Sequence, residues 1–259
     1  MDFLLGTDGA LFTRRLPIAH NVRQVSRRRE AAMKNSDFEL SANIAEQHDS
    51  GDRSYFANSR AEMLAFVPAS ARTILDIGCG SGVFGASLQS KLGAEVWGVE
   101  LTSAAIDASK ILHRALCGSI QEQMVNLPDH YFDCIVLNDV VEHLIDPWSV
   151  LRQLQHKLTE RGVVVASIPN VRHYKNLWQL LVDGSWSYTD AGILDRTHLR
   201  FFTPLSMRQL FIDCGYHVNT MQGLRGSKKF KVKLWRYISF GKLWDIVYPQ
   251  FAVVAAASD

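Results

Sequence analysis

The chain has 259 residues, of which 47% are hydrophobic, 10% aromatic and 21% charged, so it can bury a sizeable core and is neither disordered nor fibrous. Its 28 Lys and Arg residues nearly balance 26 Asp and Glu residues, and the net charge of +2 argues against nucleic-acid binding through overall charge. The four cysteines form no Cys-x-x-Cys pair, which argues against a disulfide scaffold or a structural zinc site and favours a reducing compartment.

The N-terminal residues 1–50 are predicted to form an extension that is partly mobile. Residues 1–35 hold seven basic and three acidic residues and show no sustained apolar period. Met33 is an alternative start, in which case residues 1–32 would not be native; an organelle transit peptide is less favoured because Asp2 and Asp8 are acidic. Since no run of 18 apolar residues and no secretory signal pattern occurs, we expect a soluble, cytoplasmic protein.

Residues 51–259 are predicted to form the main domain, in which apolar strands alternate with helices. The expected strands are 73–77, 95–99, 114–117, 132–137 and 163–168, with two last strands near 216–221 and 248–256. The expected helices are 83–92, 103–113, a helix from Asp146-Pro147 to Gly162, and one from Thr203-Pro204 to Gly215. This alternation is typical of an α/β fold with a parallel sheet covered on both faces.

The alternation fails at about residues 170–203, between the fifth strand and the helix that follows. A long insertion at this point is predicted to be a substrate lid rather than a passive loop. Its aromatic residues are suited to stacking on a sugar or another ring, with packing inside the lid as the alternative. They are Trp178, Trp186 and Tyr188.

A glycine-rich turn joins the first strand to the first helix. Gly78, Gly80 and Gly82 allow positive φ and close approach of a ligand, and the helix that follows offers free N–H groups. A dinucleotide fingerprint would place its third glycine at the position of Val83, and no Lys-Ser or Lys-Thr follows as in a P-loop. The turn is therefore predicted to cradle a nucleotide, with both phosphate-binding motifs disfavoured.

Two acidic residues narrow the choice of ligand. Asp76 lies beside the turn, where a carboxylate would repel a pyrophosphate and attract a positively charged ligand. Glu100, at the end of the next strand, can accept two hydrogen bonds from the 2′- and 3′-hydroxyls of a ribose. S-adenosylmethionine has a ribose and two cationic groups but no phosphate, so we predict it as the cofactor and disfavour an NAD-linked oxidoreductase.

The chain resembles the class I S-adenosylmethionine-dependent methyltransferases over about residues 55–221, in the stretches LDIGCGSGVFGASL, VWGVE, FDCIVLNDVVEHLIDPWSVLRQL and GVVVASIPN. Within that class, SIPNVRHY followed by GILDRTHLRFFT is similar to methyltransferases associated with bacterial cell-surface polysaccharide biosynthesis and, more distantly, to ubiquinone-type O-methyltransferases. The resemblance implies a Rossmann-like, doubly wound α/β sheet of seven strands, mostly parallel with an antiparallel last strand. It also implies a cofactor across the carboxyl ends of the first two strands.

The same resemblance implies roles for further residues. Asn138 would face the methyl-transfer region, and adenine recognition would rest on backbone groups around Ser119 and Ile120, because Ser119 follows the third strand where many relatives have an acidic residue. Arg60 would reach the cofactor carboxylate, or else be a solvated helix residue. The complete set of expected cofactor-binding residues is Asp76, Gly78, Cys79, Gly80, Gly82, Glu100, Leu101, Ser119, Ile120, Asn138 and Arg60.

Methyl transfer to a hydroxyl requires alignment of donor and acceptor and removal of a proton. His198 is the first candidate base, with Asp195 three residues earlier to orient it, and His143 is the second. The structural alternatives are that His143 closes a turn and that His198 is buried among phenylalanines. We predict no metal site, since the spacing of Asp139, Glu142 and His143 on a turn and helix start does not bring all three together.

The predicted function is transfer of the methyl group of S-adenosylmethionine to an oxygen of a small-molecule or sugar-containing acceptor. Two alternatives stay open: N-methylation of an amine or amino sugar, and a non-catalytic cofactor-binding partner subunit. Residues 225–242 hold seven basic and no acidic residues among aromatic ones, which predicts a peripheral membrane contact or a site for a lipid-linked acceptor. The alternative is a solvated hairpin or helix whose aromatic rings cover the sheet edge. No nucleic-acid partner is expected.

Overall fold

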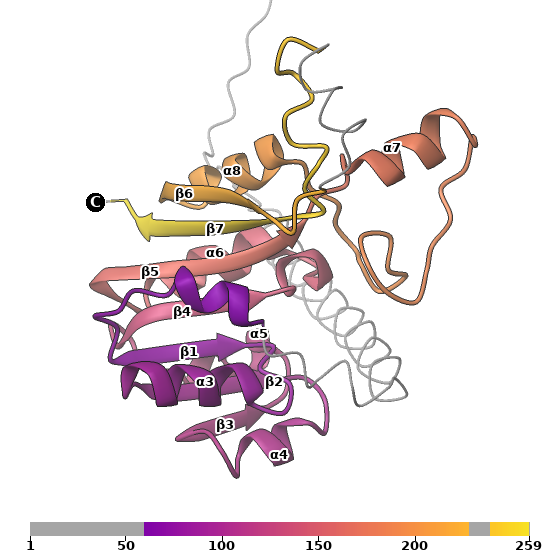
Figure 1. The fold of residues 1–259 in the computed structure, drawn as a ribbon. Coiled ribbons are helices and arrows are strands. Elements are labelled where there is room, and N and C mark those ends of the chain that lie inside the picture. The colour runs from indigo at the N-terminus through magenta and orange to yellow at the C-terminus, as the bar shows by residue number, and fades with distance from the viewer. Residues whose placement is uncertain (1–59, 228–238, 259) are drawn as a thin grey trace, which may run out of the picture. The chain divides into compact units, whose positions relative to one another are not determined.

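Seven strands pair into one sheet in residues 60–227 and 239–258, the part of the chain that the computed structural model describes (Figure 1). The strands are β1 (Thr73–Ile77), β2 (Glu95–Glu100), β3 (Arg114–Cys117), β4 (Phe132–Asn138), β5 (Leu158–Pro169), β6 (Tyr216–Leu224) and β7 (Gln250–Ala257). The N-terminal extension, the alternative start at Met33 and residues 228–238 of the basic segment lie outside the described residues.

The strand order is β3-β2-β1-β4-β5-β7-β6. Strands β1 to β5 pair in parallel, whereas β7 is antiparallel to both of its neighbours, β5 and β6. This topology confirms the predicted α/β fold, a Rossmann-like doubly wound seven-stranded sheet, mostly parallel with an antiparallel last strand. The order reverses between β1 and β4, and in open α/β sheets ligands bind at such a switch point, beyond the carboxyl ends of the strands.

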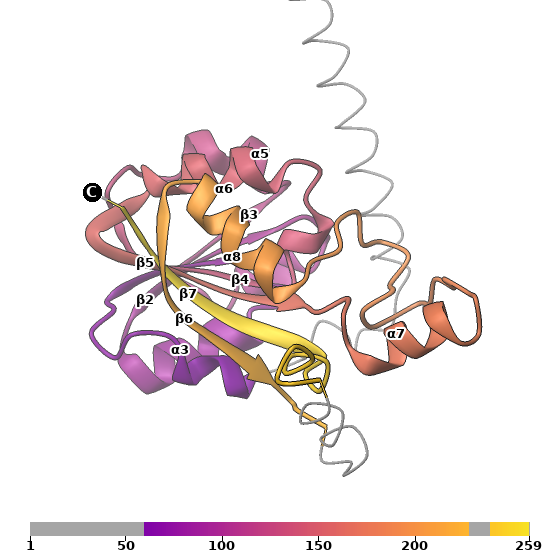
Figure 2. The same ribbon diagram turned by 90° about the horizontal axis from the view of Figure 1, so that it is seen from above.

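Helices cover both faces of the sheet (Figure 2). They are α3 (Val83–Leu92), α4 (Ala105–Ala108), α5 (Ile120–Gln123), α6 (Pro147–Gln155), α7 (Tyr174–Leu181) and α8 (Pro204–Asp213), with short 3-10 helices η1 (Ala61–Ala65), η2 (Met124–Asn126) and η3 (Val141–His143). Figure 2 shows α3 on one face of the sheet and α6 and α8 on the other.

The core is divided between these two faces because neighbouring side chains in a strand point in opposite directions. Ile74 of β1 packs in the same cluster as Phe84 and Leu88 of α3. Its neighbour Leu75 packs in the other cluster, with Leu151 of α6. Both clusters are built from nearly continuous apolar strands, the pattern expected of a parallel sheet that is buried on both faces.

Two helix boundaries were predicted wrongly. The helix predicted to run to Gly162 ends at Gln155, and β5 already begins at Leu158. Gly162 is inside the strand, where a Cβ would lie 2.8 Å from the Phe132 carbonyl oxygen, so this glycine permits close strand contact rather than ending a helix. The helix predicted over 103–113 is limited to α4. Ser109, the residue that follows α4, donates its hydroxyl to the Ile106 carbonyl, and such side-chain bonds compete with continuation of a helix.

The insertion between β5 and α8 is anchored at its base. Asn170 and Phe202 form an isolated β-bridge that brings its two ends together. The Asn170 side chain is fully buried and donates to the carbonyls of Asp245 and Tyr248, both at 3.0 Å. Helix α7 lies within the insertion, and a role as a substrate lid stays a prediction. Among the described helices, none has both the length and the apolar character that crossing a membrane requires.

Candidate functional site

The glycine-rich turn lies between β1 and α3, at the carboxyl end of β1. The Gly78 amide donates to the Val99 carbonyl at 2.8 Å, which ties the turn to β2. Gly78 has a φ of +71°, and a Cβ there would lie 2.7 Å from Cγ2 of Val140. Gly82 has a φ of +85° and is the N-cap of α3. Both positions therefore require glycine, and together they bring bare backbone to the ligand side of the sheet.

Asp76 is the buried carboxyl of this turn. Its side chain is 2% exposed, and Oδ2 has no hydrogen-bond partner within the described residues. Burial, together with the charge of Glu100, raises the pKa of Asp76 to about 8. A buried carboxyl with an unsatisfied oxygen is costly unless a donor or a cation reaches it. Asp76 therefore fits a cofactor with cationic groups, as its position in the sequence predicted.

Glu100 is buried at the end of β2, and protein groups already engage both of its carboxylate oxygens. Oε2 accepts from the Gly80 amide at 2.8 Å, and Oε1 accepts from the amide and the hydroxyl of Thr102, both at 2.9 Å. A carboxylate has about four acceptor positions, so three of them are occupied and one is left. Contact of Glu100 with the two ribose hydroxyls stays a prediction.

The residues expected around the adenine have clear structural roles. Ser119 is the N-cap of α5: its hydroxyl accepts from the Glu122 amide at 3.3 Å, and the Glu122 carboxylate accepts from the Ser119 amide at 2.9 Å. This capping box gives a reason for serine at this position. Ile120 and Cys79 are buried in the two core clusters, and Leu101 is half-buried. Contact of Ser119 and Ile120 with adenine, and of Cys79 and Leu101 with the cofactor, stays a prediction.

Asn138 ends β4, next to the carboxyl end of β1. The buried Oδ1 and Nδ2 atoms of its side chain have no partner among the described residues. Asp76 and Asn138 thus present unsatisfied polar atoms at the ends of two paired strands, beside the glycine turn. This combination fits a polar, positively charged nucleoside such as S-adenosylmethionine, with Asp76, Asn138 and Glu100 as the side chains that would hold it.

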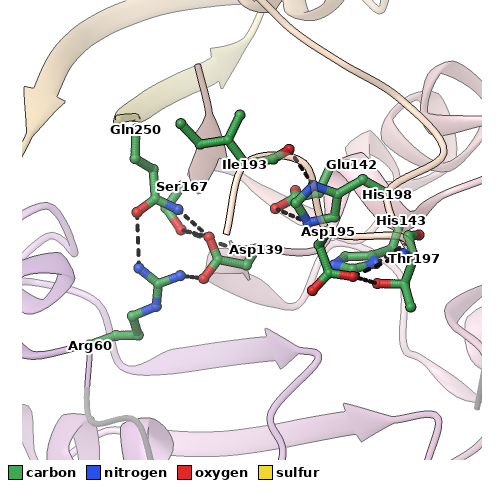
Figure 3. Close-up of polar contacts among 10 residues, drawn as sticks. All are labelled: Arg60, Asp139, Glu142, His143, Ser167, Ile193, Asp195, Thr197, His198 and Gln250. Carbon is green, nitrogen blue, oxygen red and sulfur yellow. Dashed lines mark hydrogen bonds and ion pairs between the residues drawn. The ribbon is translucent and has the colours of Figure 1, made fainter. Parts of the chain in front are cut away.

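Arg60 belongs to a polar cluster at the same edge of the sheet (Figure 3). Its guanidinium donates to Gln250 Oε1 at 3.0 Å and forms an ion pair with Asp139, to which the Gln250 amide also donates. The Ser167 hydroxyl donates to the same carboxylate at 3.3 Å. Since the Arg60 side chain is only 11% exposed, the alternative of a solvated helix residue is wrong. Its contact with the cofactor carboxylate stays a prediction.

A second cluster, Glu142, His143 and His198, joins η3 to the insertion (Figure 3). The Glu142 backbone carbonyl accepts from the amides of Leu199 and Arg200 at 2.9 and 3.0 Å, which fixes the insertion beside η3. The two imidazole rings lie edge to face with centroids 4.7 Å apart, and His198 Nε2 is 4.0 Å from Glu142 Oε1. The sequence prediction missed this grouping because His198 is remote from the other two in the chain.

The Glu142 carboxyl is the most deeply buried group of this cluster. It is 1% exposed, and neither oxygen has a hydrogen-bond partner within residues 60–227 and 239–258. Burial raises its pKa to about 8. Asp139, which is close to Glu142 and His143 in the chain, belongs to the Arg60 cluster instead.

Backbone carbonyls orient both imidazoles. His143 Nδ1 lies 3.2 Å from the Thr197 carbonyl oxygen, and His198 Nδ1 lies 3.0 Å from the Ile193 carbonyl oxygen. A carbonyl only accepts hydrogen bonds, so each Nδ1 carries a proton. The Asp195 carboxylate accepts from the amide and hydroxyl of Thr197, at 2.9 and 2.7 Å. Asp195 thus supports the residue that orients His143, while the carbonyl of Ile193 orients His198.

Aromatic side chains of the insertion stand next to His198. Phe201 lies 6.4 Å from the His198 ring, and Trp186 and Tyr188 pack against Phe201 at 5.4 and 6.2 Å between ring centroids. Trp186 and Tyr188 remain 37% and 53% exposed, so part of each ring stays accessible to a ligand despite this packing. Trp178, which was predicted to belong to the same aromatic group, is 57% exposed on α7.

Comparison with known proteins identifies a family that matches most of the chain. A family model described as a methyltransferase domain matches residues 48–220. The chain is 27% identical to a ubiquinone biosynthesis O-methyltransferase of Aeromonas salmonicida over 59% of this chain and 66% of that protein. It is 31% identical to a protein of the same name from Bradyrhizobium diazoefficiens, over 54% of this chain and 56% of that protein. The chain thus spans about two thirds or less of the length of these two relatives.

Solved structures share the fold. One is a SAM-dependent methyltransferase from Archaeoglobus fulgidus, with a TM-score of 0.56, 22% identity and coverage of 81% of this chain and 96% of that one. Another is a SAM-dependent methyltransferase from Leishmania major, with a TM-score of 0.58, 14% identity and coverage of 84% and 83%. Because the family model covers more than half of the chain and the fold agrees, the chain belongs to the methyltransferase-domain family, within the class I S-adenosylmethionine-dependent methyltransferases.

Proposed function

We propose that this protein transfers the methyl group of S-adenosylmethionine to an oxygen of a small-molecule or sugar-containing acceptor. The observation that carries the proposal is the cluster of Glu142, His143 and His198, close in the chain to the end of β4. A hydroxyl must lose its proton before or during methyl transfer, and such a cluster can take part in its removal. The names of the relatives, which are O-methyltransferases, also support an oxygen acceptor.

The cofactor supplies a methyl group on a cationic sulfur, and the protein holds and aligns the reactants. Asp76 and Asn138 would meet the polar groups of the cofactor, and Glu100 would bind its ribose. Trp186 and Tyr188 offer partly exposed rings on which an aromatic or sugar acceptor could stack. The acceptor would then lie between these rings and the methyl group, with its hydroxyl toward His198.

A methyl-transfer assay with a radiolabelled methyl group tests this proposal. Phenols, nucleotide sugars, glycolipids and amines would be offered as acceptors, and mass spectrometry of the product would locate the new methyl group. The resemblance to polysaccharide-associated methyltransferases is the reason to include sugars. We expect a methyl ether from a hydroxyl-bearing acceptor; a methylated nitrogen, or cofactor binding without turnover on any acceptor, would contradict the proposal.

A substitution tests the role of the cluster. His198→Ala should lower turnover by about 10²- to 10⁴-fold, the usual range when a group that promotes removal of the acceptor proton is lost. Binding of S-adenosylhomocysteine should stay nearly unchanged, because His198 is not among the residues expected to bind the cofactor. His217→Ala on β6, where the residue is exposed, is the matched control and should behave as wild type. Wild-type turnover of His198→Ala would exclude this residue from the chemistry.

A further inference from the structure

We propose that Glu142, His143 and His198 bind one divalent transition-metal ion through one carboxylate oxygen and two imidazole nitrogens. This proposal deepens the proposed function, since the ion would lie where the acceptor hydroxyl is expected. It replaces the prediction, made from the sequence, that the chain has no metal site. Ion binding is measured without an acceptor, so the two proposals can fail separately.

The first argument is geometric. One potential ligand atom from each of the three residues lies within 4.8 Å of the other two. Zinc binds nitrogen and oxygen ligands at about 2.0–2.2 Å, which puts neighbouring ligand atoms roughly 3–4 Å apart. The 4.0 Å between Glu142 Oε1 and His198 Nε2 already agrees with this spacing. Small side-chain rotations would bring all three atoms around one ion.

The second argument is the unsatisfied carboxyl. Both oxygens of Glu142 are buried and lack a hydrogen-bond partner in the described part of the chain. Such groups are rare in folded proteins, because an unpaired buried carboxyl loses its hydration without compensation. The nearby guanidinium of Arg60 is engaged with Asp139 and Gln250. A cation between Glu142 and the two imidazoles would satisfy the carboxylate.

The third argument is that hydrogen bonds to backbone carbonyls fix the orientation of both imidazole rings. Metal-binding histidines generally donate their second ring N–H to a carbonyl or a carboxylate, which fixes the ring and its tautomer. Here the Nδ1 atoms of His143 and His198 lie against the carbonyls of Thr197 and Ile193. In a neutral ring, a proton on Nδ1 leaves the lone pair on Nε2. The Asp195 carboxylate in turn fixes Thr197, because it accepts hydrogen bonds from the amide and hydroxyl of that residue.

The donor set indicates the kind of ion. Two imidazole nitrogens and one carboxylate oxygen suit Zn²⁺, Mn²⁺ or Fe²⁺, whereas Mg²⁺ and Ca²⁺ prefer oxygen ligands throughout. Three protein ligands leave coordination positions for other oxygens, as in catalytic zinc sites. An acceptor hydroxyl bound there would lose its proton to solvent more readily. Its oxygen would then form the new C–O bond while the S–CH₃ bond of the cofactor breaks and S-adenosylhomocysteine is released.

Equilibrium dialysis of the purified chain, after removal of metals with a chelator, tests the site directly. We expect one Zn²⁺ or Mn²⁺ per chain and much weaker binding of Mg²⁺. Glu142→Gln and His198→Ala should each weaken binding of Zn²⁺ by at least roughly 10- to 100-fold, the loss seen when even supporting residues of metal sites are changed. His217→Ala, at an exposed histidine on β6, is the matched control and should bind as wild type.

Two further measurements keep the outcome clear. Calorimetry with S-adenosylhomocysteine shows whether each variant is folded, because Glu142, His143 and His198 are not among the residues expected to bind the cofactor. Pulsed electron paramagnetic resonance of wild-type protein with Mn²⁺ should detect two coordinated imidazole nitrogens and needs no variant. Absence of binding, or wild-type affinity in Glu142→Gln, would overturn the metal site alone. Metal binding without methyl ether formation would overturn the proposed function and leave the site in place.

Discussion

We expect recognition of the cofactor to depend on a single buried carboxyl, that of Asp76. Its pKa is raised to about 8 by burial and by Glu100, so at neutral pH the free protein holds it mostly in the protonated form. A cationic cofactor favours the ionised form. Binding of S-adenosylmethionine should therefore release a proton from Asp76.

This coupling predicts that affinity for S-adenosylmethionine rises with pH. From about pH 6 to about pH 8 the gain should approach tenfold per pH unit and then level off, because Asp76 is then already ionised. Calorimetry in buffers with different ionisation heats would measure both the affinity and the number of protons released. Asp76→Asn should bind more weakly and lose most of this pH dependence. A wild-type affinity that does not change with pH would show that Asp76 does not meet the cationic groups.

At the same scale, local spacing in the sequence predicted which residues lie together at the glycine-rich turn. Asp76 and the glycines are close together in the chain, and Glu100 follows at the next strand end, so a pattern of neighbours was sufficient to predict that these residues lie together. Glu142 and His198 form one cluster only because the insertion folds back onto η3. A contact between residues so far apart in the chain produces no regular spacing in the sequence. The predictions for His143 and His198 therefore did not include the Glu142 carboxyl that lies beside them.

At the scale of elements, the turn after β1 packs directly against the turn after β4. The missing side chain of Gly78 makes room for Val140, the residue before η3. Val140 thus links the glycine-rich turn, which we expect to hold the cofactor, to the helix that carries Glu142 and His143. A substitution at Gly78 should therefore perturb both the glycine-rich turn and the position of η3.

Gly78→Ala should lower the free energy of unfolding by at least about 1–2 kcal/mol, since L-residues are strained at positive φ. Contact with Val140 should add to this loss. Urea denaturation of Gly78→Ala, Val140→Ala and the double variant forms a double-mutant cycle. We expect the double variant to be more stable than the sum of the single losses implies. Simple additivity would mean that the strain comes from the backbone alone.

Element boundaries were predictable where the turn chemistry is unambiguous. Strands β1 and β3 begin and end as predicted. Helix α8 begins after Thr203, as predicted, because the Thr203 side chain accepts a hydrogen bond from the Ser206 amide. The boundary between α6 and β5 failed because Gly162 was interpreted as a helix end. A glycine that makes room for a neighbouring strand looks the same in one sequence as a glycine that ends a helix.

At the scale of the whole molecule, α7 and the segment before β7 form one region with exposed apolar side chains. The Tyr174 amide donates to the Ile246 carbonyl at 2.9 Å, and Arg172 lies 3.4 Å from the Asp245 carboxylate. Phe240 is 96% exposed. Exposed apolar side chains near a basic segment are typical of surfaces that meet membranes.

We therefore expect salt-sensitive flotation of the protein with anionic vesicles and none with neutral ones. Each basic residue near such a surface contributes about 1 kcal/mol, so changing four lysines of the basic segment to glutamine should abolish most of the binding. Lysine-to-glutamine changes at Lys91 and Lys110, elsewhere on the molecule, are the control. No flotation at low salt would favour the structural alternative for residues 225–242. The four lysines are Lys228, Lys229, Lys231 and Lys233.

The position of β7 has a consequence for synthesis of the protein. Strand β7 lies between β5 and β6 in the sheet, yet it follows both of them in the chain. On the ribosome, β5 and β6 therefore emerge with no partner between them, and the apolar edge of β5 stays open until β7 arrives. Open strand edges invite pairing with other chains. Until β7 has been synthesised and has paired, the nascent chain thus needs protection from such pairing.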